Sequence, residues 1–214
     1  HYGYRTKSMG EEILSLNPDA VLLWHKYPMK TIIPVNTSKK FDLVFFARVC
    51  KEKGIEDLLR AVSIIKKDKP DISLCVIGGG KSESFEKLAV DLGIAENVTW
   101  AGFLPTQEDV HKLVSGARIS VLPTYHDIIS GTIIESLFLK IPVVAYNVGG
   151  IHEVNEKEEI ISLVEKQNIK ALAETIDFLL DNPDIREIRS EKGYKRAQEM
   201  FNYSDVEIRD SLLS

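Results

Sequence analysis

Two acidic residues flank a small polar turn in the second half of this 214-residue chain. Asp127 and Glu135 lie on either side of the tripeptide Ser130-Gly131-Thr132, and an apolar stretch follows the turn. If a helix begins there, its first backbone N–H groups are free and its N-terminus carries partial positive charge, which suits a phosphate. Carboxylates accept hydrogen bonds from hydroxyl groups such as those of a ribose or a hexose. The segment therefore predicts a site for a sugar nucleotide.

Each acid also has an ordinary structural interpretation when it is taken alone. Glu135 is also explained as a buried acid satisfied by the backbone, or as a first-turn acid that complements the helix dipole. Asp127 is also explained as a turn residue. The ligand site is favoured because both acids occur together with the small turn and with the following pair Gly149-Gly150.

A second group of candidate residues follows earlier apolar runs. Arg48 and Lys53 lie in a charged loop, and cations at the mouth of a parallel sheet can neutralise a pyrophosphate. A solvated loop without a ligand explains these charges equally well. Gly79 is the centre of a glycine triplet that would let the backbone approach a ligand or simply make a tight turn. The triplet fits neither a P-loop nor the dinucleotide fingerprint, which would require glycine in place of Glu83.

The composition is that of an ordinary globular protein, with 44% hydrophobic and 28% charged residues. A net charge of -5 argues against a nucleic-acid partner. Cys50 and Cys75 form no Cys/His pattern with metal-ligand spacing, so we expect reduced thiols and no metal site. The longest apolar runs are too short to cross a bilayer, and the chain shows no signal peptide.

From residue 41 onward, short apolar runs alternate with amphipathic segments. The pattern predicts strands over residues 43–47, 72–77, 97–103, 119–123, 143–145 and 160–164. It predicts helices over residues 55–67, 82–92, 107–115, 131–139, 169–180, 185–200 and 204–213, and a single helical turn over 151–154. Ser82 and Thr106 are expected N-caps, and Gly93 is expected to end a helix. Upstream, a helix over residues 8–16, a strand over 20–25 and an irregular linker over 27–40 are expected.

This alternation predicts an α/β fold: a doubly wound, mostly parallel, Rossmann-like sheet with helices on both faces. In such sheets ligands bind at the carboxyl ends of the strands. The candidate loops all follow predicted strands, at residues 48–54, 78–82, 103–106, 125–132 and 147–150. We therefore expect the five loops to meet at one rim of the sheet.

Four blocks of this sequence resemble the C-terminal, donor-binding domain of retaining GT-B glycosyltransferases of family 4, the glycosyl transferases group 1. The resemblance covers roughly residues 33 to 213, and its blocks are FFARVCKEKGIEDLLRAV, LCVIGGGKSESFEKLAVDLGIAENVTWAGFLP, ISVLPTYHDIISGTIIESLFLKIPVVAYNVGGIHEV and FNYSDVEIRDSLL. Their order, spacing and number make a chance agreement implausible.

The resemblance implies a role for each candidate residue. Arg48 and Lys53 match the cation pair that holds the donor diphosphate. Asp127 falls where the family has the first acid of an E-x7-E motif, a residue that contacts the donor sugar. The side chain of Asp127 is one methylene shorter than the usual glutamate, and the segment DIIS replaces the usual EGFG. Glu135 matches the second acid, which binds the ribose hydroxyls. Phe103 matches a loop near the nucleotide base.

The phosphate cradle implied by the resemblance consists of backbone amides at the helix start. These are the amides of Ser130, Gly131, Thr132 and Ile133. Gly79 completes the expected donor-binding set. Asp127, Arg48 and Lys53 are the residues expected nearest to the chemistry.

The resemblance also implies a function and a domain organisation. Residues 41–200 would be the donor domain, residues 1–40 the remnant of an N-terminal acceptor domain plus linker, and residues 201–214 a helix packing back toward it. The whole protein would transfer a sugar from a nucleoside diphosphate sugar to a hydroxyl acceptor with retention, in surface polysaccharide or glycolipid synthesis. It would need no metal or other cofactor, and this chain alone would not complete the transfer. The two reduced thiols fit a cytoplasmic protein, and the glycan or lipid-linked acceptors of the family leave peripheral contact with the inner face of the membrane open.

Two other functions remain open at this stage. A sugar-nucleotide epimerase of the same fold would need acid/base residues at the sugar, and His126 is the nearby candidate. A non-catalytic nucleotide-sugar-binding module is suggested by Asp127 and the DIIS loop. A dinucleotide oxidoreductase is excluded because the glycine spacing and the ribose-binding acid are missing.

Overall fold

The computed structural model describes residues 2–4, 7–20, 22–24, 32, 34 and 38–201. A sheet of six parallel strands forms its centre, in the order β5-β4-β3-β6-β7-β8. The strands are β3 (Phe41–Phe46), β4 (Leu74–Ile77), β5 (Val98–Gly102), β6 (Ala117–Leu122), β7 (Val143–Tyr146) and β8 (Ser162–Val164). Within this sheet the chain runs first through β3, continues outward through β4 to β5, and then crosses back to β6. The strand order therefore reverses between β3 and β6.

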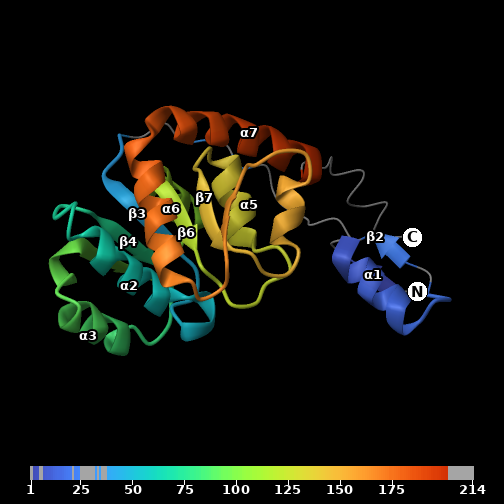
Figure 1. Cartoon of the computed structure of the whole chain (residues 1–214), viewed down its shortest axis with the longest axis horizontal. Helices are drawn as coiled ribbons and strands as arrows, with labels where there is room; N and C mark the ends of the chain where they lie inside the picture. The colour runs from blue at the N-terminus through green and yellow to red at the C-terminus, as the bar shows by residue number, and fades with distance from the viewer. Residues whose placement is uncertain are drawn as a thin grey trace.

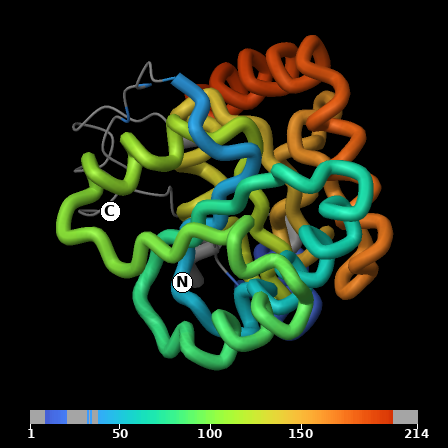
Figure 2. The backbone as a smooth tube through the Cα atoms, turned by 90° about the vertical axis from the view of Figure 1, so that its left-hand side faces the viewer, coloured from blue at the N-terminus to red at the C-terminus, as the bar shows by residue number. Residues whose placement is uncertain are grey.

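Helices cover both faces of this sheet (Figure 1). They are α2 (Ile55–Ile65), α3 (Glu83–Asp91), α4 (Gln107–Ser115), α5 (Gly131–Phe138), α6 (Ile169–Asp181) and α7 (Pro183–Phe201). Helix α6 packs on α2 and on strands β6 to β8, α3 packs against α2, and α7 packs against α5. Helices α3 and α7 lie at opposite ends of the domain (Figure 2). The predicted doubly wound, Rossmann-like α/β fold is confirmed.

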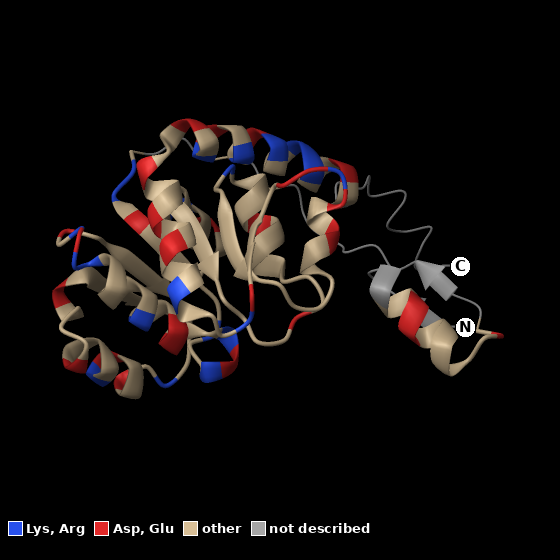
Figure 3. Ribbon diagram, in the orientation of Figure 1, with Lys and Arg blue, Asp and Glu red and all other residues tan. Residues whose placement is uncertain are grey.

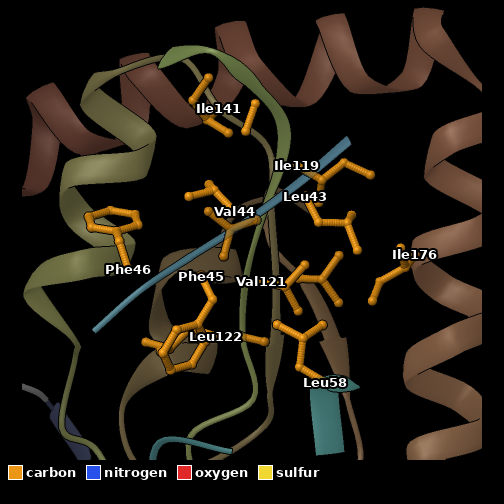
Figure 4. Packing of buried hydrophobic residues seen from close by; sticks show 14 of the residues in the cluster. Leu43, Val44, Phe45, Phe46, Leu58, Ile119, Val121, Leu122, Ile141 and Ile176 are labelled. Atoms are coloured by element: carbon orange, nitrogen blue, oxygen red, sulfur yellow. The ribbon is translucent and has the colours of Figure 1, made fainter. Parts of the chain in front are cut away.

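Burial of both faces of the central strands explains their continuous apolar sequences. Strand β3 is buried from Leu43 to Phe46, although neighbouring side chains point to opposite faces. Leu43 points to the side on which Ile176 of α6 lies, and Phe46 points to the opposite side (Figure 4). Because helices cover both faces, no polar alternation appears in this strand, and the core extends through all three layers.

Two of the three predicted capping residues, Thr106 and Gly93, lie where the sequence predicts them, and Ser82 is the exception. Thr106 caps α4 by accepting a hydrogen bond from the Asp109 N–H at 3.1 Å, as predicted. Gly93 follows α3 with φ +69°, a conformation that favours glycine. Ser82 occupies the N-cap position of α3 but does not cap it. Its hydroxyl donates instead to Glu86 Oε1 at 2.6 Å, because Ser82 already has helical dihedral angles and its side chain points along the helix.

The N-terminal residues add a small two-stranded sheet. The predicted helix is α1 (Lys7–Leu16), and the predicted strand contains β2 (Leu22–Trp24). Strand β1 (Tyr2–Tyr4), which pairs with β2 in parallel, was not predicted. Most of the predicted linker over 27–40 and the whole predicted helix over 204–213 lie outside the described residues.

Charged residues of both signs lie side by side along α7, while the strands of the sheet carry few charges (Figure 3). Among the described residues, no helix combines the length and apolarity that a bilayer crossing requires. The described part of the chain also contains no group of three His, Cys, Asp or Glu residues arranged to hold a metal ion.

A buried hydrogen bond links α2 to β7. The hydroxyl of Tyr146 donates to Asp57 Oδ2 at 2.8 Å, and both residues are buried. Tyr125 stacks on Tyr146 with ring centroids 6.3 Å apart. Burial, followed by hydrogen bonding to Asp57, raises the pKa of both hydroxyls, that of Tyr125 to about 12. Since folding raises these pKa values, the two protonated hydroxyls stabilise the folded state at any pH below the ordinary tyrosine pKa. This contribution to the free energy of unfolding is lost as pH rises through the pKa values of the folded state.

We expect Tyr146→Phe to lower the free energy of unfolding by about 1–3 kcal/mol, because it removes a donor from a buried carboxylate. Urea denaturation at neutral pH measures the loss. Tyr194→Phe is the matched control, since its ring packs edge-on against Phe138 and its hydroxyl has no hydrogen-bond partner within the described residues. Equal stability changes in the two variants would contradict the assigned role of the Tyr146 hydroxyl.

Candidate functional site

The five loops expected to carry chemistry follow the carboxyl ends of β3, β4, β5, β6 and β7. Because these strands are all parallel, the loops lie at one rim of the sheet. The reversal of strand order between β3 and β6 opens a crevice at this rim, the usual ligand position in doubly wound folds. The predicted convergence of the loops is confirmed.

The loop after β3 is held directly against the loop after β6. Gly54, which ends the 3₁₀ turn η1 (Lys51–Lys53), has φ +77°, and an added Cβ would lie 1.9 Å from the Pro123 carbonyl oxygen. The Tyr125 N–H donates to the Glu52 carbonyl at 2.8 Å. This close backbone packing places the cationic loop beside the acidic one.

The contact joins two of the predicted site residues. Lys53 Nζ lies 2.8 Å from Asp127 Oδ2, and the two side chains are 25% and 17% exposed. Arg48, by contrast, is exposed at the crevice and makes no ion pair within the described part of the chain. One cation of the predicted pair is therefore neutralised by Asp127, and the other is available to an anion.

The glycine pair after β7 shapes the Asp127 loop. Gly149 has φ +54°, and a Cβ there would lie 1.7 Å from the Asp127 carbonyl oxygen. The N–H of Gly150 donates to the Ile128 carbonyl at 2.7 Å. A side chain at position 149 would therefore push the Asp127 loop away from its place beside Lys53.

The N-terminus of α5 presents free amides toward the rim. Ser130 is the N-cap residue, its hydroxyl makes no capping bond, and its carbonyl accepts from the N–H groups of Ile133 and Ile134 at 3.0 and 3.2 Å. The Ile133 amide is thus already used, which narrows the expected cradle to the amides of Ser130, Gly131 and Thr132, for which the described residues offer no backbone acceptor. The hydroxyl of Thr132 donates to the Phe46 carbonyl at 2.8 Å and fixes the helix to β3.

Glu135 lies one turn into α5 and has a partner that the sequence did not indicate. His111 Nε2, on α4, lies 3.0 Å from Glu135 Oε2. The two side chains are 13% and 19% exposed. The contact joins residues of two helices, 24 positions apart, and no local pattern in the sequence signals it.

A pocket of about 630 Å³ opens at the crevice. It is bordered by β3, the glycine triplet, the loop after β5, the start of α4 and α5; its lining includes Phe46, Arg48, Gly79, Phe103, Thr106, Val110 and Glu135. Phe103 is 78% exposed although it is large and apolar. A flat exposed ring at a pocket edge is suited to stacking against a base.

A second opening of about 490 Å³ lies beside Asp127. His126, Ile128, Val148 and Gly149 line it together with Asp127. Asp127 is therefore not among the lining residues of the larger pocket, whereas Arg48 and Glu135 are.

The glycine triplet has a structural role at two of its three positions. Gly78 and Gly80 have φ values of +147° and +144°, and added Cβ atoms would lie 1.9 and 2.4 Å from the carbonyl oxygens of Ala47 and Val49. Gly78 and Gly79 both line the pocket, and a Cβ added at Gly79 would lie 3.9 Å from Phe103. Two of the glycines thus allow the loop to pass close to the chain after β3.

The comparisons with known proteins agree on one family. A family model described as "Glycosyl transferases group 1" matches residues 30–196. An uncharacterized glycosyltransferase of Haemophilus influenzae is 28% identical over 168 residues, which are 76% of this chain and 47% of that protein. The capsular polysaccharide biosynthesis glycosyltransferase CapM of Staphylococcus aureus is 27% identical over 162 residues, 76% of this chain and 42% of that protein. The chain spans less than half the length of these relatives.

Among solved structures, a mutant of S. aureus TarM in complex with fondaparinux, α-GlcNAc-glycerol and UDP matches with a TM-score of 0.85 at 20% identity. The match covers 99% of this chain and 42% of TarM. At this identity the likeness establishes the fold, which this chain shares with GT-B glycosyltransferases.

Proposed function

This chain belongs to the glycosyl transferases group 1 family, and from that premise we propose that it is the donor-binding half of a retaining glycosyltransferase. The whole protein would move a hexosyl group from a nucleoside diphosphate sugar to a hydroxyl acceptor in surface polysaccharide or glycolipid synthesis. The observation that carries the proposal is the pocket at the reversal of strand order, which a free guanidinium, a carboxylate and an exposed aromatic ring all border.

The pocket contains groups suited to each part of a nucleoside diphosphate. The exposed ring of Phe103 is placed for the base, and Glu135 for the ribose hydroxyls. Arg48 and the first amides of α5 are placed for the diphosphate, since Thr132 fixes that helix to Phe46 at the pocket wall. The sugar would then extend toward the second opening, beside Asp127 and Lys53.

The proposed chemistry needs charge stabilisation rather than a metal. As the bond between the sugar and the diphosphate breaks, negative charge accumulates on the leaving phosphate. Arg48, Lys53 and the N-terminus of α5 would stabilise that charge because they are already positioned at the rim. Attack by the acceptor on the same face as the leaving group, assisted by the leaving phosphate, would give retention.

The domain organisation remains part of this proposal. Residues 41–200 form the donor domain, and residues 1–40 belong to a preceding acceptor domain and its linker. Residues 202–214, for which a returning helix is expected, lie outside the described residues. The acceptor, glycan or lipid-linked, would bind in the preceding domain, so this chain alone would bind the donor without transferring the sugar.

A thermal-shift panel of the 214-residue chain with UDP, GDP, ADP and their common sugar conjugates tests this proposal. We expect the nucleotides that share one base to raise the melting temperature at millimolar concentration, whereas those of the other bases do not. A ligand that binds only the folded state stabilises it by mass action. Inorganic phosphate at the same concentration is the control and should give a smaller shift. A panel without any nucleotide-specific shift would contradict the proposed donor site.

A sugar-nucleotide epimerase is the second candidate, because His126 and Asp127 line the same opening. Incubation of the donor selected by the panel without acceptor distinguishes the two functions. An epimerase would accumulate an epimerised free donor or its sugar, detectable by proton NMR. A transferase donor domain would leave the donor unchanged.

A further inference from the structure

We propose that His111 is a positioning residue that orients Glu135 toward a ribose, which makes the pocket selective for ribonucleotides. The inference rests on the proposed function, because it assumes that a nucleoside diphosphate occupies the larger pocket. His111 belongs to no recognised motif of the chain, and its contact with Glu135 depends on the packing of α4 near α5.

The geometry fixes one oxygen of the carboxylate and leaves the other available. His111 Nε2 lies 3.0 Å from Glu135 Oε2, and since a carboxylate only accepts hydrogen bonds, we assign the hydrogen to Nε2. Glu135 Oε1 has no hydrogen-bond partner within the described residues. It faces the start of α5, where a Cβ on Gly131 would lie 3.9 Å from it. Oε1 is therefore the oxygen that remains available to a ligand.

The surroundings of the pair favour a role at the pocket. Val110, which immediately precedes His111, and Glu135 both line the pocket, while His111 itself is not among its lining residues. The imidazole thus supports the carboxylate from behind and does not occupy the space of a ligand. At 13% and 19% exposure, both side chains are largely shielded from water that would otherwise replace the contact.

A carboxylate held in one orientation can accept directional hydrogen bonds from the two neighbouring hydroxyls of a ribose at a smaller entropic cost. Without His111, Glu135 would lose rotamer definition, and one of its oxygens would lose its partner. The consequence is specific: the hydroxyl-dependent part of the affinity should fall, while the base and diphosphate contacts remain.

The test compares UDP, GDP and ADP with their 2′,3′-dideoxy counterparts by calorimetric titration of the full chain. In the unaltered chain we expect the dideoxy form of the preferred nucleotide to bind at least about tenfold more weakly, as for a lost hydrogen bond to a charged group. His111→Leu and His111→Asn should reduce this ratio to about threefold or less, because neither can place a donor at the Nε2 position. His111→Gln should keep the ratio near its original value, since its amide reaches that position.

Lys112→Ala, an exposed change on the same helix, is the matched control and should leave the ratio unchanged. If His111→Leu and His111→Asn weaken both nucleotide forms equally, His111 only ties the helices together and the inference is overturned. A ratio near one in the unaltered chain would overturn it as well, while leaving nucleotide binding intact. Absence of all nucleotide binding would instead reject the proposed function, and the inference with it.

Discussion

Replacing Gly54 with alanine is expected to lower the free energy of unfolding by about 3 kcal/mol or more and to abolish ligand binding at the rim. The left-handed backbone at φ +77° alone costs alanine roughly 1–2 kcal/mol. The added Cβ would also lie 1.9 Å from the Pro123 carbonyl oxygen, an impossible distance. Since the neighbouring atoms belong to the backbone and to a proline ring, the loops after β3 and β6 would have to separate.

Gly93 provides a matched control for this effect. It has a similar φ of +69°, but a Cβ there would meet nothing within 4 Å. Gly93→Ala therefore carries only the conformational cost, and urea denaturation of both variants isolates the contribution of the loop contact. Equal losses in the two variants would show that the contact between the loops does not stabilise the rim.

Removing the cations of the rim should give the largest change in ligand affinity. We expect Arg48→Met and Lys53→Met each to weaken nucleoside diphosphate binding by about 10- to 150-fold, the range for a charged hydrogen bond of about 1.5–3 kcal/mol. The two variants should differ in stability. Lys53→Met leaves Asp127 without its partner at 17% exposure, so its melting temperature should fall, whereas that of Arg48→Met should not.

Lys51→Met is the control for these two variants, because Lys51 lies in the same turn and is exposed. Titration calorimetry with the nucleotide selected by the thermal-shift panel gives the affinities. If Lys51→Met weakens binding as much as Arg48→Met, general electrostatic attraction accounts for the effect and the assignment of Arg48 is wrong.

The alternation of apolar and amphipathic segments was sufficient to predict the fold, because the central parallel strands are buried on both faces and leave a plain signal. Features that depend on few residues were harder to predict. Strand β1 has only three residues, and its pairing with β2 depends on a partner 20 positions away. Ser82 has the residue type of an N-cap, but its dihedral angles turn its hydroxyl toward Glu86.

The site was predicted better at the level of loops than at the level of contacts. Parallel strands bring the loops after them to one rim whatever their sequences, so Arg48, Glu135 and Phe103 were expected together. The pairing of Lys53 with Asp127 joins residues 74 positions apart, and no periodicity encodes it. The same is true of the contact between His111 and Glu135. Such contacts are fixed by tertiary packing rather than by local sequence.

The ion pair also gives Asp127 a defined place in the proposed mechanism. In this structure the acid holds Lys53 at the mouth of the crevice and lies beside the second opening. We expect a bound diphosphate to compete for Lys53, which would release Asp127 toward the sugar. Asp127→Asn tests this directly, because it keeps the shape and removes the charge: nucleoside diphosphate affinity should be unchanged or higher, and a marked loss of affinity would contradict the competition.

The central claim is that a nucleoside diphosphate binds at the carboxyl rim of the sheet, and amide chemical-shift mapping of the ¹⁵N-labelled chain with UDP, GDP and ADP tests it most directly. For the nucleotide that binds, we predict the largest shifts at the five rim loops, and in particular at Arg48, Gly79, Phe103, Gly131 and Thr132. Shifts concentrated at the opposite rim, around the pocket lined by Asp42, Lys69 and Arg118, would contradict the account.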